Sequence, residues 1–178
     1  MTHKIVCAGF GGQGVLSIGT MLAYSAMLEG KEVSWLPSYG PEMRGGTANC
    51  SVIISDEGVG SPIVNKPDIL VAMNLPSLDK YETEAVPGAV ILVDSSLIQR
   101  KVARQDVKAY YIPATKMASD AGIPSLANMI LMGYLIAKTG AIPFEIIDQA
   151  LKKVVSAKHQ DKLEVNRKAI ELGYHYHE

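Results

Sequence analysis

The chain has 178 residues, of which 48% are hydrophobic and 20% charged, as in an ordinary globular protein. A chain of this length buries roughly two-thirds of the surface that its unfolded form exposes, so we expect one domain covering residues 1–178. Lys and Arg number 17 against 18 for Asp and Glu, a balance that lacks the basic excess of nucleic-acid-binding proteins. Neither disorder nor nucleic-acid binding is expected.

Two cysteines, Cys7 and Cys50, are too few for a disulfide scaffold, an iron–sulfur cluster or a four-thiolate zinc site. The histidines show no metal-ligand spacing, so we predict no metal site. Residues 1–4 lead into a strand-like segment without the pattern of a secretory signal. The uncharged stretch between Asp120 and Lys138 indicates a buried helix and not a membrane span. We therefore expect a cytoplasmic protein.

The first 36 residues predict a strand, a helix and a second strand. Residues 4–8 form an apolar run that ends in glycines, and residues 15–29 place apolar side chains at helical spacing before the stop signal Gly30. Residues 32–36 read as the second strand. This order predicts a βαβ unit with a right-handed crossover.

The rest of the chain continues the alternation and then becomes helical. Apolar and β-branched runs predict strands at 48–54, 69–73, 89–93 and 110–112. Helical spacing predicts helices at 76–84, 125–138, 143–155 and 160–172. Pro143 is expected at a first helical position, with Gly140 and Gly173 just past helix ends. The pattern predicts a three-layer α/β/α sandwich with a mostly parallel sheet and a helical C-terminal third.

Residues 9–14 read Gly-Phe-Gly-Gly-Gln-Gly and fit the Gly-x-Gly-x-x-Gly spacing between a strand and a helix. Such a turn can bind a phosphate or carboxylate at the N–H groups of the first helical turn. A dinucleotide would need an acidic residue at the end of the second strand, but that strand ends Trp35-Leu36-Pro37, so NAD is disfavoured. The alternative is that the glycines serve packing alone. Gln13 favours binding, because its amide can offer a donor and an acceptor to a ligand or a facing subunit.

Residues 38–46 read Ser-Tyr-Gly-Pro-Glu-Met-Arg-Gly-Gly, a loop with an aromatic, a carboxylate and a guanidinium among glycines. In an extended backbone Glu42 and Arg44 point to the same side, so Glu42 could orient Arg44 toward a carboxylate or phosphate. The alternative is a surface salt bridge, which contributes only about 0–1 kcal/mol and explains little of this setting.

Two asparagines are candidates for polar roles. Asn74 follows a predicted strand, and we interpret it first as the cap of the next helix. Asn128 lies in an apolar helix, where a buried amide must find partners in the glycine-rich turn or a neighbouring chain. The sequence contains no nucleophile elbow, no phosphate-binding loop ending in Gly-Lys-Ser/Thr and no Cys-x-x-Cys. No catalytic residue is therefore assigned.

The motifs at 9–15 and 38–46 together resemble the gamma subunits of 2-oxoacid:ferredoxin oxidoreductases. Weaker similarity covers essentially the whole chain, through residues 61–62, 72–74, 128–129, 133, 166 and 173–174. The resemblance implies a domain of the pyruvate/ketoisovalerate oxidoreductase type, within an oxygen-sensitive, multi-subunit enzyme of anaerobic metabolism. Such an enzyme oxidatively decarboxylates a 2-oxoacid, transfers the acyl group to coenzyme A and reduces ferredoxin.

The resemblance also implies a division of labour between subunits. Thiamine diphosphate and iron–sulfur clusters are expected on alpha, beta and delta-type partners, while this chain helps to form the coenzyme A region and is inactive alone. Residues 73–80 are most similar to 2-oxoglutarate-using members, with pyruvate and 2-oxoisovalerate enzymes related. The residues assigned to the site by motif match are Gly11, Gly12, Gln13, Gly14, Tyr39, Glu42, Arg44, Gly45 and Gly46.

Two other hypotheses stay open. One is a free-standing nucleotide-binding or dinucleotide-binding α/β protein, which would use the glycine-rich turn by itself. The other is a structural assembly module in which that turn binds nothing. Isolated chains are also expected to be able to form homodimers through a surface meant for partners.

Overall fold

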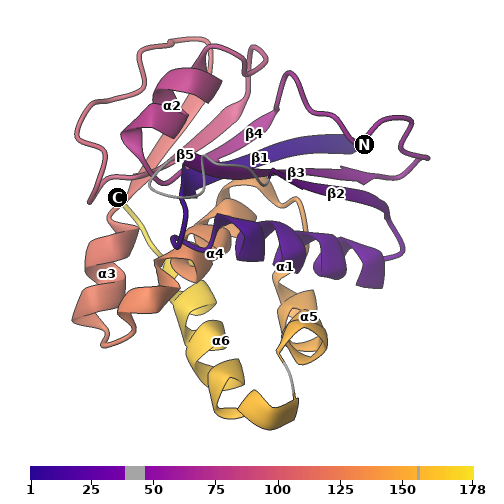
Figure 1. The fold of residues 1–178 in the computed structure, drawn as a ribbon, viewed down its shortest axis with the longest axis vertical. Coiled ribbons are helices and arrows are strands. Elements are labelled where there is room, and N and C mark those ends of the chain that lie inside the picture. Colours follow the sequence, from indigo (N-terminus) through magenta and orange to yellow (C-terminus); the bar gives the residue numbers. More distant parts are fainter. Residues whose placement is uncertain (39–46, 156) are drawn as a thin grey trace.

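The computed structural model describes residues 1–38, 47–155 and 157–178, which form one six-stranded sheet with helices on both faces (Figure 1). The strands follow the order β2-β3-β1-β4-β5-β6. Their bounds are β1 Thr2–Phe10, β2 Glu32–Ser38, β3 Thr47–Ser55, β4 Ile69–Ala72, β5 Val90–Asp94 and β6 Lys108–Ile112. All the strands predicted from the sequence are present.

The helices are α1 Val15–Leu28, α2 Leu75–Glu82, α3 Ala114–Asp120, α4 Ala127–Thr139, α5 Ile147–Val154 and α6 Asp161–Tyr174. Short 3₁₀ turns occupy Pro124–Leu126, Phe144–Ile146 and Ala157–His159. Among these described helices none is long and apolar enough to cross a lipid bilayer. The uncharged stretch before Lys138 is instead buried as α4 against the sheet and α6.

The sheet is mostly parallel, as predicted. β1 pairs with β4, β4 with β5 and β5 with β6 in parallel, whereas β3 is antiparallel to both β1 and β2. Five of the six strands therefore run in one direction. All four residues of β4 are buried, as expected for a central parallel strand that is covered on both faces.

The expected βαβ unit needs a correction, because β2 does not lie beside β1. β3 separates them and pairs with β1 along the whole register, from Thr2 opposite Ser55 to Phe10 opposite Thr47. A parallel neighbour requires a crossover of about a dozen residues or more, and the eight residues between β2 and β3 are too few. β3 therefore returns antiparallel and takes the place next to β1.

Helices cover the two faces unequally (Figure 1). Ile5 and Cys7 of β1 face a large core that includes residues of α1, α4, α5 and α6. Val6 and Ala8 point to the other face, where α2 contributes Leu78 and Tyr81. This confirms the three-layer sandwich and places α1 and α2 on opposite sides of β1.

Two expectations about the helical third are corrected. Gly173 lies inside α6 and not past its end, because α6 crosses α4 there so closely that a Cβ on Gly173 would lie 1.7 Å from the Ile130 carbonyl oxygen. Pro143 precedes a 3₁₀ turn, and α5 begins only at Ile147. Gly140 ends α4 with φ +62°, as predicted.

Candidate functional site

The parallel strands end at one edge of the sheet, where Phe10 closes β1, Ala72 closes β4 and Asp94 closes β5. From this edge the chain passes from β1 into α1 on one face and from β4 toward α2 on the other (Figure 1). Open α/β sheets bind ligands where successive connections turn to opposite faces. The neighbouring ends of β1 and β4 form that place, and the turn at residues 11–14 begins there.

The turn places glycines where the backbone is left-handed. Gly12 has φ +92° and Gly14 has φ +79°, and within the described ranges every residue with positive φ is a glycine. Gly14 is the N-cap of α1, and no side chain in the described part of the chain caps that helix. Its first-turn N–H groups and the helix dipole therefore favour an anion. A Cβ on Gly12 would meet none of the described residues within 4 Å, so these residues leave the backbone open to approach.

Gln13 joins the ends of two strands. The Phe10 N–H donates to Gln13 Oε1 at 2.6 Å, and Gln13 Nε2 donates to the Met73 carbonyl oxygen at 3.0 Å. Gly9 makes room for this arrangement, since a Cβ there would lie 2.5 Å from Gln13 Oε1. One donor and one acceptor of the amide are thus used within the chain, and one of each remains for a ligand.

Both asparagines take the positions expected of them. Asn74 caps α2, accepting from the Ser77 N–H at 2.9 Å, and Asn128 Nδ2 donates to the Gly14 carbonyl oxygen at 3.1 Å. A Cβ on Gly14 would lie 2.4 Å from Asn128 Nδ2. Asn128 therefore reaches the glycine-rich turn from α4 and fixes Gly14, the N-cap of α1.

A cleft of about 190 Å³ opens beside the turn. Residues that follow β1, β4, β5 and β6 line it together with the 3₁₀ turn before α4: Gly12, Gln13, Met73, Leu97, Thr115, Pro124, Ser125 and Ala127. Leu97 is 46% exposed, and Phe10 and Leu75 at the same edge are similarly exposed. Apolar side chains held in solvent around a glycine-rich turn are typical of a surface that contacts another molecule.

Sequence reasoning missed Asp94, a fully buried carboxylate at the end of β5. It accepts from Thr115 Oγ1 at 2.6 Å and from the Ser96 N–H at 3.1 Å, and so holds Thr115 beside the cleft. The sequence did contain a signal for it: Asp94 directly follows four apolar residues, 90–93, at the end of a predicted strand.

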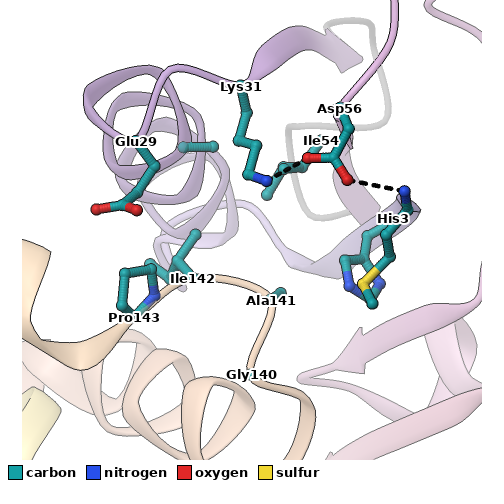
Figure 2. A pocket seen from close by; sticks show the side chains of 11 residues that line it. His3, Glu29, Lys31, Ile54, Asp56, Gly140, Ala141, Ile142 and Pro143 are labelled. Carbon is teal, nitrogen blue, oxygen red and sulfur yellow. Dashed lines mark hydrogen bonds and ion pairs between the residues drawn. The ribbon is translucent and has the colours of Figure 1, made fainter.

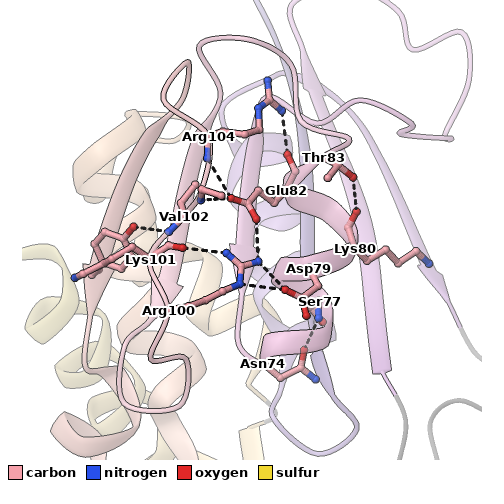
Figure 3. A network of polar contacts seen from close by, with 12 residues as sticks. Asn74, Ser77, Asp79, Lys80, Glu82, Thr83, Arg100, Lys101, Val102 and Arg104 are labelled. Carbon is pink, nitrogen blue, oxygen red and sulfur yellow. Dashed lines mark hydrogen bonds and ion pairs between the residues drawn. The ribbon is translucent and has the colours of Figure 1, made fainter.

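A polar network fastens the segment after β5 onto α2 (Figure 3). Arg100 donates to Asp79 at 2.7 Å and to Glu82 at 2.8 Å, and Arg104 donates to the Glu82 carbonyl oxygen at 2.9 Å. The Glu82 side chain is buried, so its charge is stabilised by Arg100 and by backbone N–H groups of the same segment. This network holds in place the segment after β5, whose Leu97 lines the cleft.

A larger hollow, of about 300 Å³, lies at the opposite edge of the sheet (Figure 2). Two of its charged side chains are paired: Asp56 accepts from Lys31 and, at 2.8 Å, from the N-terminal ammonium, while Glu29 also lines the hollow. Hydrogen bonding to Lys31 lowers the pKa of Asp56 to about 2. The exposed pair links the turn after α1 to the end of β3. We interpret it as structural because its charges already satisfy each other.

The second predicted loop lies outside the described residues. Tyr39, Glu42, Arg44, Gly45 and Gly46 therefore have no structural description. The residues that flank the loop are described: Ser38 ends β2, and Thr47 begins β3 opposite Phe10. Both flanks thus lie at the edge where the glycine-rich turn begins.

The cysteine positions do not fit an iron–sulfur cluster on this chain. Cys7 and Cys50 are both buried in the core between the sheet and α1. Across the described ranges, no group of three or more His, Cys, Asp or Glu residues is placed to hold a metal ion.

Comparisons with known proteins agree with this fold. Residues 4–176 match the family model described as pyruvate ferredoxin/flavodoxin oxidoreductase. The chain is 41% identical over 172 residues to the ketoisovalerate oxidoreductase subunit VorA of Methanothermobacter thermautotrophicus, covering 96% of this chain but 35% of that relative. It is 38% identical over 177 residues to the 2-oxoglutarate synthase subunit KorC of Methanocaldococcus jannaschii, covering 98% and 93%.

A solved structure gives the same result in three dimensions. The gamma subunit of a keto/oxoacid ferredoxin oxidoreductase from Geobacter sulfurreducens superposes with a TM-score of 0.82 at 32% identity, over 97% of this chain and 96% of that one. The chain therefore belongs to the pyruvate ferredoxin/flavodoxin oxidoreductase family, among its gamma-type subunits. It spans about a third of VorA and nearly the whole of KorC.

Proposed function

We propose that this chain is the gamma subunit of a cytoplasmic 2-oxoacid:ferredoxin oxidoreductase, which converts a 2-oxoacid and coenzyme A to an acyl-CoA while reducing ferredoxin. The observation that carries the proposal is the family match over residues 4–176, with 38% identity across nearly all of a KorC subunit. The proposed partners are alpha, beta and delta-type subunits, which would carry thiamine diphosphate for decarboxylation and iron–sulfur clusters for electron transfer.

In this proposal the chain binds and positions and does not transform the substrate. The uncapped N-terminus of α1 would face a phosphate of coenzyme A, with Gly12 allowing close approach and Gln13 holding the turn to β4. Gly11 and Gly14 belong to the same turn. Tyr39, Glu42, Arg44, Gly45 and Gly46 are proposed to act from the second loop, whose flanks Ser38 and Thr47 lie at the same edge. The exposed Phe10, Leu75 and Leu97 would contact the partner subunits.

The dinucleotide alternative loses support from the strand order. In a dinucleotide-binding sheet the acidic residue that binds the ribose ends the strand next to β1. Here β3 occupies that position and runs antiparallel, so it begins, and does not end, at the carboxyl edge. The glycine-rich turn is therefore interpreted as part of an assembled coenzyme A region.

We propose 2-oxoglutarate as the substrate, on the similarity at residues 73–80 and the KorC relative. The VorA relative is slightly more identical, so 2-oxoisovalerate is the acid to test beside it. Pyruvate is the third acid to test.

The test is anaerobic affinity purification of the tagged chain from its native cell, followed by ferredoxin reduction with each acid, with and without coenzyme A. We expect co-purified partner subunits and coenzyme A-dependent activity that is highest with 2-oxoglutarate. Activity with 2-oxoisovalerate alone would overturn the proposal that 2-oxoglutarate is the substrate, but it would support the assignment as a gamma subunit. A chain that purifies without partners and binds NAD or a flavin tightly would overturn the assignment itself.

A further inference from the structure

The two cysteines of the chain face each other across the antiparallel pair of β1 and β3. Cys7 and Cys50 are direct register partners, and both side chains belong to the core on the α1 side of the sheet. Directly opposite Cα atoms in antiparallel strands lie about 4.5–5.5 Å apart. A disulfide needs about 4.4–6.8 Å between its Cα atoms, a range that contains the spacing of directly opposite residues.

The two thiols shift each other's pKa, and Cys50 Sγ also donates to the Val15 carbonyl oxygen at 3.4 Å. A hydrogen bond with Cys50 and burial raise the pKa of Cys7, whereas the same hydrogen bond, with help from the Trp35 indole, lowers the pKa of Cys50. Cys50 is therefore the thiol that ionises first, and the thiolate is the form that reacts with oxidants. Cys7 is placed beside it as the second sulfur.

Trp35 and Gly19 lie next to Cys50. A Cβ on Gly19 would lie 2.5 Å from Cys50 Sγ and 2.7 Å from Trp35 Nε1, so the absence of a side chain there lets the sulfur and the indole sit together. Trp35 lies on the edge strand β2 and is 38% exposed. We therefore infer that a small neutral oxidant approaches the buried Cys50 past Trp35, the partly exposed side chain that contacts it.

We propose that Cys7 and Cys50 form an oxidative modification site, which hydrogen peroxide converts into an intrachain disulfide between β1 and β3. The Cys50 sulfur attacks one peroxide oxygen, the O–O bond breaks, and the other oxygen leaves as water after taking a proton, which gives a sulfenic acid. The Cys7 sulfur then displaces that hydroxyl group, which leaves as a second water. The two thiols lose two electrons and the peroxide gains them.

The disulfide would tie together the two strands that border the candidate site. β1 continues from Cys7 to the glycine-rich turn, and β3 begins at Thr47, opposite Phe10, three residues before Cys50. Oxidation would therefore fix the spacing of these strands close to the edge where the glycine-rich turn begins. This inference does not depend on the proposed enzyme activity.

The test uses the reduced full-length chain, treated with hydrogen peroxide and then alkylated under denaturing conditions for mass spectrometry. We expect both thiols to be lost to alkylation, with the mass falling by two hydrogens and no oxygen added. Trp35 is the only tryptophan, and it lies against Cys50, so its fluorescence should fall as the disulfide forms and recover with dithiothreitol.

Single variants provide the controls. Cys50→Ala should keep Cys7 fully alkylatable after peroxide treatment, whereas Cys7→Ala should leave Cys50 to gain oxygen. The proposal is overturned if the oxidised wild-type chain retains both thiols, gains oxygen without losing hydrogens, or is crosslinked only between molecules. Because these measurements are made on the wild-type chain, they decide the question even if a variant fails to fold.

Discussion

Gly12 and Gly14 adopt the same left-handed backbone but have different surroundings. A Cβ on Gly12 would meet none of the described residues, whereas a Cβ on Gly14 would lie against the Asn128 amide. A side chain at either position strains the backbone by about 1–2 kcal/mol. Only at Gly14 does it also displace a buried hydrogen-bond partner.

We therefore expect Gly14→Ala to lower the free energy of unfolding by about 3 kcal/mol or more, and Gly12→Ala by about 1–2 kcal/mol. Urea denaturation of the two variants measures the difference. Equal losses would show that Asn128 moves aside without cost, and would contradict the role assigned to its bond with the Gly14 carbonyl oxygen.

Gln13→Ala removes the bonds to the Phe10 N–H and the Met73 carbonyl oxygen. We expect a loss of about 1–2 kcal/mol in unfolding free energy. If the proposed function holds, the assembled enzyme should also show a higher KM for coenzyme A. Gln99→Ala, an exposed amide in a loop, is the matched control and should change neither quantity. An unchanged KM in Gln13→Ala would favour a purely structural turn.

At the scale of elements, the crossing of α4 and α6 depends on two glycines. A Cβ on Gly133 would lie 1.9 Å from the Ile170 carbonyl oxygen, and the Gly173 approach is closer still. We expect Gly173→Ala to reduce the unfolding free energy by at least about 3 kcal/mol, because the obstacle is backbone and cannot rotate away. Gly58→Ala, where a Cβ would meet none of the residues that the structure describes, should have little effect. A mild Gly173→Ala phenotype in thermal denaturation would mean that the two helices separate easily.

The Asp56 pair makes stability depend on pH at the opposite edge. The folded pKa of Asp56, about 2, lies below its ordinary value of 3.8. A depressed folded pKa adds stability above about pH 4, and this contribution disappears as the pH falls toward 2. The stability difference between wild type and Asp56→Asn should therefore shrink over that interval. Glu57→Gln, a neighbouring exposed carboxylate, is the control. A difference that stays constant from pH 5 to pH 2 would contradict the pairing.

At the scale of the whole molecule, we predict that residues 1–178 unfold as one domain. The large core contains residues of the sheet together with α1, α4, α5 and α6. Urea transitions followed by far-ultraviolet circular dichroism and by Trp35 fluorescence should coincide. Separate transitions would show that the helical C-terminal third unfolds independently of the sheet.

The sequence predicted best those structural features that depend on residues close together in the chain. The strand–turn–helix at residues 4–28, the Asn74 cap and the Gly140 helix end depend on neighbours in the chain, and all were predicted. Gly173 was misplaced because a glycine near a helix end reads as a stop signal. Its actual role comes from α4, distant in sequence.

The sequence by itself determined the α/β class, the family and the glycine-rich turn, because periodicity and motif spacing are properties of a short stretch of chain. Tertiary structure alone decided that β3 lies between β1 and β2, that Gln13 bridges β1 and β4, and that Asp94 holds Thr115 at the cleft. These are contacts between segments far apart in sequence. Their partners are chosen by the packing of the whole core, which no local pattern records.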